Sequence, residues 1–189
     1  MTCGLSSNSK VFESVFNKST SAVKFAGSSI VMSMTYDSLD RGETYDYDEY
    51  NDLETFLFEL DGRSGIAKIP LFHNVGAPAK GTPVISVADQ LGGSISTNGW
   101  NPNQLVIKRG EFITINNELK KVMGNVMSDA TGNATITIAP WLRSSPEVGT
   151  PIITENPYGL FRLTDDNNSM DITAMNGAVT LSFKEAFYV

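Results

Sequence analysis

Hydrophobic and polar residues alternate along much of the chain, and this alternation predicts a protein built mainly from β-strands. The clearest case is the segment 30–36, in which Ile30, Met32, Met34 and Tyr36 would share one face of a strand. A serine and a threonine lie between them, so the opposite face would meet solvent. This pattern is typical of a half-buried strand in an antiparallel sheet.

Turn-forming residues interrupt the strand-like segments and predict three hairpins. Asparagine and glycine tolerate the positive φ that two-residue hairpin turns require. The expected turns are Asn116-Asn117 between strands over 111–115 and 118–122, a turn at 131–133 leading into a strand over 134–138, and Asn176-Gly177 between strands over 170–175 and 178–183.

A single segment, about 47–60, has the periodicity of an amphipathic helix. Asp46 is the expected N-cap and Glu49 its partner in a capping box, while Gly62 would end the helix in a left-handed conformation. A further strand is expected over 66–72. The apolar stripe of the helix consists of Leu53, Phe56, Leu57 and Leu60.

Two segments rich in proline and glycine, 73–83 and 144–159, divide the chain. Between them, residues 82–155 contain short strand-like runs with closely spaced turns, which is typical of a small barrel or sandwich. The simplest architecture is therefore a main domain formed by residues 1–80 and 157–189, interrupted by a small inserted β domain over 82–155.

The charge of the chain is concentrated in one segment. The 189 residues include 41% hydrophobic residues, enough for a buried core, and carry a net charge of −7. Residues 37–61, here called the acidic strip, hold ten acidic residues and one arginine, so the strip carries −9 and the remaining residues sum to +2. This distribution argues against specific nucleic-acid binding, which needs clustered lysine and arginine.

The inventory of reactive residues indicates neither an enzyme nor a cofactor site. Cys3 and His73 are the only residues of their types, which excludes internal disulfides, multi-cysteine zinc sites and HExxH motifs. No nucleophile elbow, phosphate-binding loop or calcium-binding loop occurs. No run of 18 apolar residues occurs, and the first residues lack the apolar core of a secretory signal, so we expect no secretory leader, synthesis in a cytoplasm and no membrane partner.

Basic and aromatic residues of the inserted domain offer two further interpretations. The pairs Lys108-Arg109 and Lys120-Lys121 are expected at solvated strand ends. Trp100 and Trp141 are candidate contact aromatics, either as a platform for sugars or as part of an interface or core.

Several short segments follow one another in a set order from about residue 22 to the C-terminus. They are FLFELDGRSG (56–65), GWNPN (99–103), RGEFITI (109–115), ELKKV (118–122), DATGNATITI (129–138), PWLR (140–143) and NPYGLFRL (156–163). This order resembles that of the distal tail, or minor tail, proteins of tailed bacteriophages, which sit below the tail tube at the baseplate.

The resemblance implies a fold and a function. The expected fold is an antiparallel β-sandwich with one α-helix that forms a homo-oligomeric ring, commonly a hexamer, with a small β-barrel-like domain inserted in it. The expected function is that of a structural virion protein at the phage tail tip, a ring adaptor around the DNA ejection channel. Expected partners are other copies of the chain, the tail tube protein, the tail hub or fibre protein and the tape measure protein.

In such a ring, the acidic strip would become a repeated feature. Six copies would bring about −54 charges together, and a negative channel wall would resist DNA adhesion. We therefore name Asp46, Asp48, Glu49 and Asp52 as candidate channel or inter-subunit residues.

Three alternatives to the adaptor remain open from the sequence. One is another tail ring, such as a terminator or head–tail connector. The others are a carbohydrate-binding adhesin that uses Trp100 and Trp141, and a glycoside hydrolase that uses a pair of acids from the strip.

Overall fold

The computed structural model describes residues 1–24, 27–40, 49–166, 171–172 and 176–187. Within them the protein is mainly β, with antiparallel sheets, one helix and a nearly closed, barrel-like sheet. The predicted fold class, a β-sandwich with one helix plus a small barrel-like part, is confirmed.

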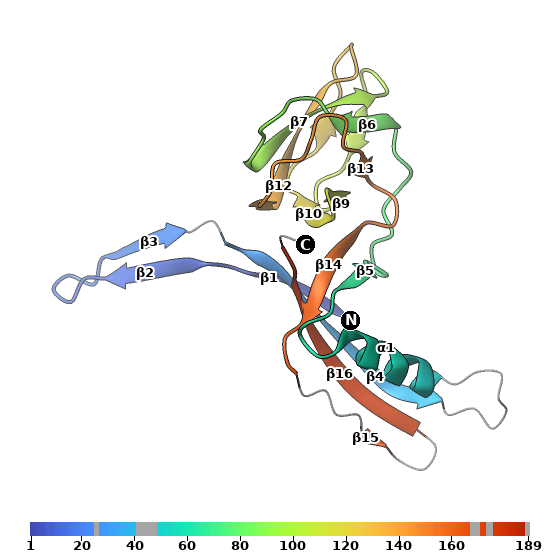
Figure 1. Cartoon of the computed structure of the whole chain (residues 1–189). Helices are drawn as coiled ribbons and strands as arrows, with labels where there is room; N and C mark the ends of the chain where they lie inside the picture. The colour runs from blue at the N-terminus through green and yellow to red at the C-terminus, as the bar shows by residue number, and fades with distance from the viewer. Residues whose placement is uncertain (25–26, 41–48, 167–170, 173–175, 188–189) are drawn as a thin grey trace.

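The first sheet is built from both ends of the chain (Figure 1). Its strands follow the order β1-β4-β16-β14-β5, with β15 beside β16, and the helix α1 (Glu49–Leu60) packs against this sheet. The strand bounds are β1 (Thr2–Ser6), β4 (Ser29–Asp40), β5 (Ala67–Pro70), β14 (Tyr158–Leu163), β15 (Asp171–Ile172) and β16 (Asn176–Glu185).

The second sheet is built from the middle of the chain and follows the order β13-β9-β10-β12-β7-β6. A bridge between Val84 and Pro151 brings its two edges together, so the sheet nearly closes on itself. β8 and β11 pair separately. The strand bounds are β6 (Gly81–Ile85), β7 (Gly92–Trp100), β8 (Leu105–Ile107), β9 (Phe112–Ile115), β10 (Glu118–Val122), β11 (Val126–Met127), β12 (Ala134–Leu142) and β13 (Ile152–Ile153).

A two-stranded hairpin projects from the first sheet, away from the rest of the molecule (Figure 1). It consists of β2 (Ser9–Glu13) and β3 (Thr20–Lys24), which pair with each other and with no other described strand. We call residues 9–24 the arm.

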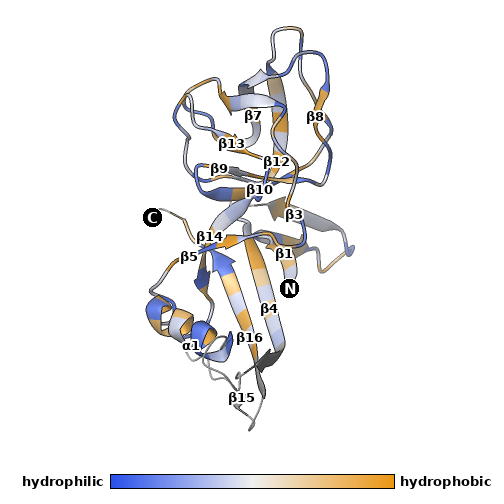
Figure 2. Ribbon diagram, turned by 90° about the vertical axis from the view of Figure 1, so that its right-hand side faces the viewer, coloured by the Kyte–Doolittle hydropathy of each residue, from blue (hydrophilic) through white to orange (hydrophobic). Residues whose placement is uncertain are grey.

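Hydrophobic side chains gather in two cores. Hydropathy colouring marks apolar stretches along β4 and β12, one in each sheet (Figure 2). The first core also includes Phe112 and Leu119 from the second sheet, so the two sheets share buried apolar contacts. The second core lies inside the barrel-like sheet and is rich in isoleucine.

The two strongest sequence patterns are confirmed. Ile30, Met32 and Met34 are buried on one face of β4, and Tyr36 packs against the same core. On α1, Leu60 is buried and the other three residues of the predicted stripe pack against this core. Local periodicity was sufficient in both cases because each element has one buried face.

The ends of α1 are described in part. The predicted N-cap, Asp46, lies outside the described residues, and the helix is seen from Glu49 onward. At the other end Gly62 has the expected left-handed conformation, with φ of 64°. The amide of Gly65 donates to the carbonyl of Leu60 over 2.7 Å, which satisfies one of the free carbonyls at the helix end.

Of the three predicted hairpins, the one with the turn at Asn116-Asn117 is confirmed. Asn116 and Asn117 have φ of 48° and 64°, and Ile115 pairs with Glu118 across the turn. These angles are the left-handed values of a type I′ turn, which suits the twist of a two-residue hairpin.

The other two hairpin predictions need correction. The turn at 131–133 leads into β12 as expected, but β12 pairs with β7 and β10, while the preceding strand β11 pairs with β8. Asn176 and Gly177 are not the turn of the last hairpin: they lie within β16, where Gly177 pairs with Leu39 of β4. Long-range pairing overrides the local turn preference of Asn-Gly here.

The two connections between the sheets run side by side. Gly76 forms a bridge with Glu155, and the hydroxyl of Thr154 donates to the carbonyl of Ala77 over 2.7 Å. Gly76 has φ of 68°, and a Cβ there would lie 1.9 Å from the carbonyl oxygen of Thr154. Glycine is therefore required at this close approach of two chain segments.

Candidate functional site

The arm exposes large hydrophobic side chains. At its tip Val15 is 86% exposed and Phe16 is fully exposed, and along the strands Val11, Phe12 and Val23 are also exposed. Such a concentration of apolar surface on a projecting element is unusual for a protein that remains monomeric. Exposing apolar surface to water costs free energy, and only burial against a partner offsets that cost.

The two faces of the arm differ. Lys10 pairs with Val23 and Phe12 with Ser21, so Lys10, Phe12 and Val23 lie on one face. The ammonium of Lys10 lies 5.0 Å from the centre of the Phe12 ring. Val11 points from the opposite face. The first face therefore combines two apolar side chains with a cation.

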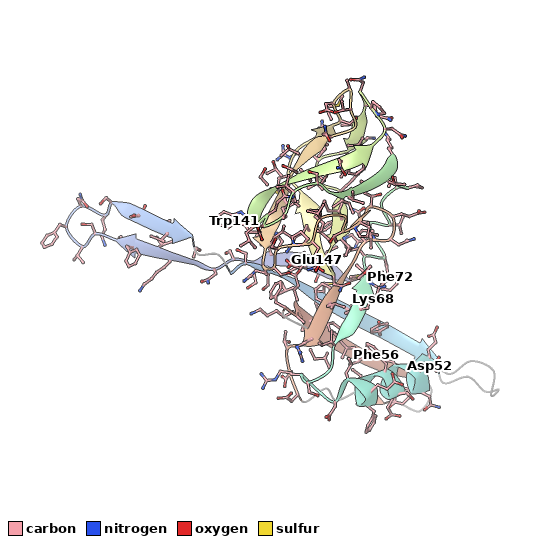
Figure 3. The ribbon with its side chains drawn as sticks, turned by 45° about the horizontal axis from the view of Figure 1, so that its top comes forward. Asp52, Phe56, Lys68, Phe72, Trp141 and Glu147 are labelled. Atoms are coloured by element: carbon pink, nitrogen blue, oxygen red, sulfur yellow. The ribbon has the colours of Figure 1, made fainter. Side chains whose placement is uncertain are left out.

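The acidic side of α1 faces solvent. Of the four candidate acidic residues, Glu49 and Asp52 are exposed in the first turn of the helix. Acidic residues in this position interact favourably with the helix dipole. Asp46 and Asp48 lie outside the described residues. Figure 3 places Asp52 and Phe56 on α1, far from Trp141 and Glu147 on the part built around the second sheet.

One aromatic residue stands among the acids of α1. Phe58 is 79% exposed and lies on the side of the helix away from the buried Leu60. Glu54 lies four residues before Phe58 and therefore on the same side of the helix. Among the described residues, no Lys or Arg nitrogen lies within 4.0 Å of the carboxylates of Glu49, Asp52, Glu54 or Glu59.

The two tryptophans do not form a shared surface. Trp100 is 3% exposed and its indole nitrogen donates to the hydroxyl of Thr97 over 2.8 Å, inside the second core. This burial removes Trp100 as a contact aromatic. Trp141 is 46% exposed and covers Gly93, where a Cβ would lie 2.7 Å from the indole nitrogen.

An open groove crosses the outside of the second sheet. Its lining is mostly hydroxyl, amide and carboxylate groups, and neither tryptophan contributes to it. At one end the carboxylate of Asp129 accepts hydrogen bonds from the amide of Asn133 and from the amide and hydroxyl of Thr131. These bonds lower the pKa of Asp129 to about 2. The bonds hold the loop before β12 in place.

A buried ion cluster joins the two sheets. Lys120 has no exposed side-chain surface, which overturns its prediction as a solvated strand end, whereas Lys121 is exposed as expected. The ammonium of Lys120 lies 2.6 Å from a carboxylate oxygen of Glu118 and 3.9 Å from one of Glu185. Glu185 belongs to β16 of the first sheet, so the cation links the two parts of the molecule.

The remaining polar atoms of this cluster are largely satisfied. Glu118 accepts hydrogen bonds from the amides of Arg143 and Ser144, and Glu185 accepts one from the amide of Ile30 over 3.1 Å. The Arg143 guanidinium also donates to the carbonyl of Ser28. Burial raises the pKa of Glu185, and the charge of Lys120 opposes this effect.

The described residues contain no group of three or more His, Cys, Asp or Glu side chains that could hold a metal ion. No helix in the same part of the chain has the length and apolarity needed to cross a membrane.

Sequence reasoning missed the two most informative features, the arm and the buried Lys120. The apolar residues of the arm are visible in the sequence, but their exposure depends on the absence of a covering element. Lys120 follows Leu119 in a strand-like run, and only its tertiary partners distinguish it from Lys121.

Comparison with known proteins adds no family to this picture: no protein-family model and no curated protein sequence matches the chain.

Proposed function

We propose that the protein is a structural subunit that assembles with copies of itself into a closed ring, and that this ring is the distal tail adaptor of a tailed bacteriophage. The observation that carries the proposal is the arm. It presents apolar side chains on an element that contacts little else in its own chain. An apolar projection of this kind gains free energy when a partner covers it.

The position of the arm supports a ring. It projects from one side of the first sheet, while α1 lies at the other side (Figure 1). A contact between an arm and a distant surface of the next copy is heterologous, and repeated heterologous contacts generate rings when the rotation closes. A hexamer is the ring size implied by the resemblance to distal tail proteins.

The place of the ring in the particle rests on that same resemblance. The ring would join the tail tube to the hub or fibre at the tail tip, contact the tape measure protein and surround the path of the DNA. The acidic strip supports this placement, because repeated negative charge close to the channel would keep DNA from adhering.

Native mass spectrometry of the purified protein tests the ring. Six copies of a 20.5 kDa chain give about 123 kDa for the expected hexamer. A monomer that binds glycans would overturn the proposal in favour of an adhesin. Glycan hydrolysis that is lost on an Asp→Asn change in the acidic strip would overturn it in favour of a glycoside hydrolase.

Antibody labelling of intact virions tests the location. Label at the tip of the tail is the expected result. Label at the head–tail junction would instead assign the protein to a connector or terminator ring, and would contradict the adaptor function while leaving the ring intact.

A further inference from the structure

We infer that the arm of one copy packs along α1 of a second copy, with Phe12 and Val23 against Phe58 and with Lys10 beside Glu54. This inference rests on the proposed ring and names the contact that builds it. It assigns the side of α1 that carries Glu54 and Phe58 to the interface between subunits.

The partner helix belongs to another copy because of where the two elements lie. The arm and α1 are on opposite sides of the molecule in Figure 1 and in Figure 3. The arm forms its own two-stranded sheet, with no ladder to any other described strand. A contact between these two surfaces therefore joins two molecules.

The two elements match in length. β2 has five residues, which span about 17 Å in an extended strand. α1 has twelve residues, which span about 18 Å as a helix. A hairpin laid along this helix would cover it from end to end.

The charges of the two surfaces are complementary. The arm holds three lysines and one glutamate, a net charge of +2. Lys18 is engaged by Glu13 over 3.2 Å, whereas Lys10 has only the ring of Phe12 beside it among the described residues. Neither the half-buried Glu54 nor the exposed acids of α1 have a basic partner in the described part of their own chain. Complementary charge steers the two surfaces together and fixes their register.

The apolar surfaces are complementary as well. Phe58 is the exposed aromatic of α1, with 79% of its surface accessible to solvent. Phe12 is 49% exposed and Val23 is 43% exposed on the Lys10 face of the arm. Packing these three side chains together would remove apolar surface on both copies from water. Aromatic side chains at the centre of a contact commonly carry much of its affinity.

Matched substitutions on the two faces of the arm test the contact. Phe12→Ser should weaken self-association at least about tenfold, measured by native mass spectrometry across a concentration series. Val11→Ser, on the opposite face of the same strand, should leave self-association unchanged. Both side chains are exposed, so both variants should keep the circular dichroism spectrum and melting temperature of the unchanged protein.

A charge exchange tests the acceptor. Lys10→Glu and Glu54→Lys should each weaken self-association, because each places like charges opposite one another in the contact. The double variant, with both changes in every copy, should recover most of the lost association. Lys18→Glu serves as the matched control, since Lys18 is already paired within the arm.

The outcomes distinguish failure of the arm contact from failure of the proposed ring. Rings that persist in Phe12→Ser would overturn the arm contact and leave the proposed function standing. Loss of association in Phe12→Ser without recovery in the charge exchange would overturn α1 as the acceptor. An unchanged protein that stays monomeric at all concentrations would overturn the proposed function, and the arm contact with it.

Discussion

Lys120 shows how a single buried charge can tie two parts of a chain together. Its ammonium is enclosed completely, and its two carboxylate neighbours come from different sheets. A buried cation is tolerated only when it is paired and hydrogen bonded, and here the carbonyl of Trp141 accepts a further hydrogen bond from it over 3.2 Å. The cluster therefore fixes β10 against β16.

Removal of this cation should be costly, and the cost should depend on pH. Lys120→Met leaves the carboxylates of Glu118 and Glu185 buried without their cation, which should lower the free energy of unfolding by about 3–5 kcal/mol at pH 7. Burial already raises the pKa of Glu185, and loss of Lys120 removes the effect that opposes it. The folded state then holds the proton more tightly than the unfolded chain does.

The sign of the pH effect follows from this raised pKa. Protonation of Glu185 contributes fully to stability below the pKa of the unfolded chain, about 4.3 for Glu. This contribution is lost as the pH rises through the pKa of Glu185 in the folded state. Urea denaturation should therefore show a smaller deficit for Lys120→Met at pH 5 than at pH 7. Lys121→Met, one residue away but exposed, should change stability by less than about 0.5 kcal/mol at either pH. An equal deficit at both pH values would contradict this account.

Asp129 should contribute to acid stability in the opposite direction. Its folded pKa of about 2 lies below the value of an unfolded chain, because the amide of Asn133 and the groups of Thr131 bind the charged form. This contribution is present above about pH 4 and is lost as the pH falls toward 2. Thermal melts should thus show Asp129→Asn destabilised at pH 6, with the difference from the unchanged protein shrinking below pH 4. A difference that stays constant down to pH 2 would contradict the prediction.

Among the secondary-structure elements, those with purely local causes could be predicted from the sequence. β4 and α1 each bury one face, so their periodicity is visible in the chain. The turn at Asn116 and Asn117 needs two positive φ angles, which asparagine adopts at low cost. Exposure of Glu49 and Asp52 does not follow from this periodicity, because they lie four residues before Leu53 and Phe56 of the apolar stripe; they are exposed in the first turn of the helix.

Elements that depend on distant partners could not be predicted. The Asn176-Gly177 pair is drawn into β16 by its ladder with β4, more than one hundred residues away in sequence. Trp100 is buried because β7 forms a wall of the barrel-like sheet, and its indole finds Thr97 there. The exposure of the apolar side chains of the arm likewise depends on tertiary structure, because no other described strand pairs with β2 or β3. The apolar surface of the arm was therefore missed, and the four acidic residues named from the sequence stay a prediction.

The two connections between the sheets, which lie side by side at Gly76 and Glu155, provide a prediction about secondary-structure elements. Gly76→Ala should destabilise the protein by at least about 2 kcal/mol, because alanine is strained at φ of 68° and its Cβ would collide with the carbonyl oxygen of Thr154. Chemical denaturation measures the effect. Gly124→Ala is the matched control, since a Cβ at Gly124 meets nothing within 4 Å, and it should fall within about 0.5 kcal/mol of the unchanged protein.

At the scale of the whole molecule, the separation of the arm from α1 determines what kind of assembly the chain can form. The arm and α1 lie on opposite sides of the molecule (Figure 1). A symmetric dimer would therefore need both arm-to-helix contacts to form at once between the same two molecules, which this separation disfavours. In the proposed contact each copy would offer one arm and one acceptor, and addition of copies would continue until the chain of contacts closes.

This head-to-tail logic predicts the result of mixing two defective copies. A Phe12→Ser copy has a defective arm and an intact α1, while a Glu54→Lys copy has an intact arm and a defective acceptor. Alone, each should be monomeric at concentrations where the unchanged protein forms rings. Mixed, they can make one intact contact and no second one, so they should stop at a 1:1 dimer of about 41 kDa, twice the 20.5 kDa of one chain. Native mass spectrometry of the mixture decides the matter. Full rings from the mixture, or dimers of either variant alone, would mean that the contact is not head-to-tail, because neither species can form when every junction needs one intact arm and one intact helix.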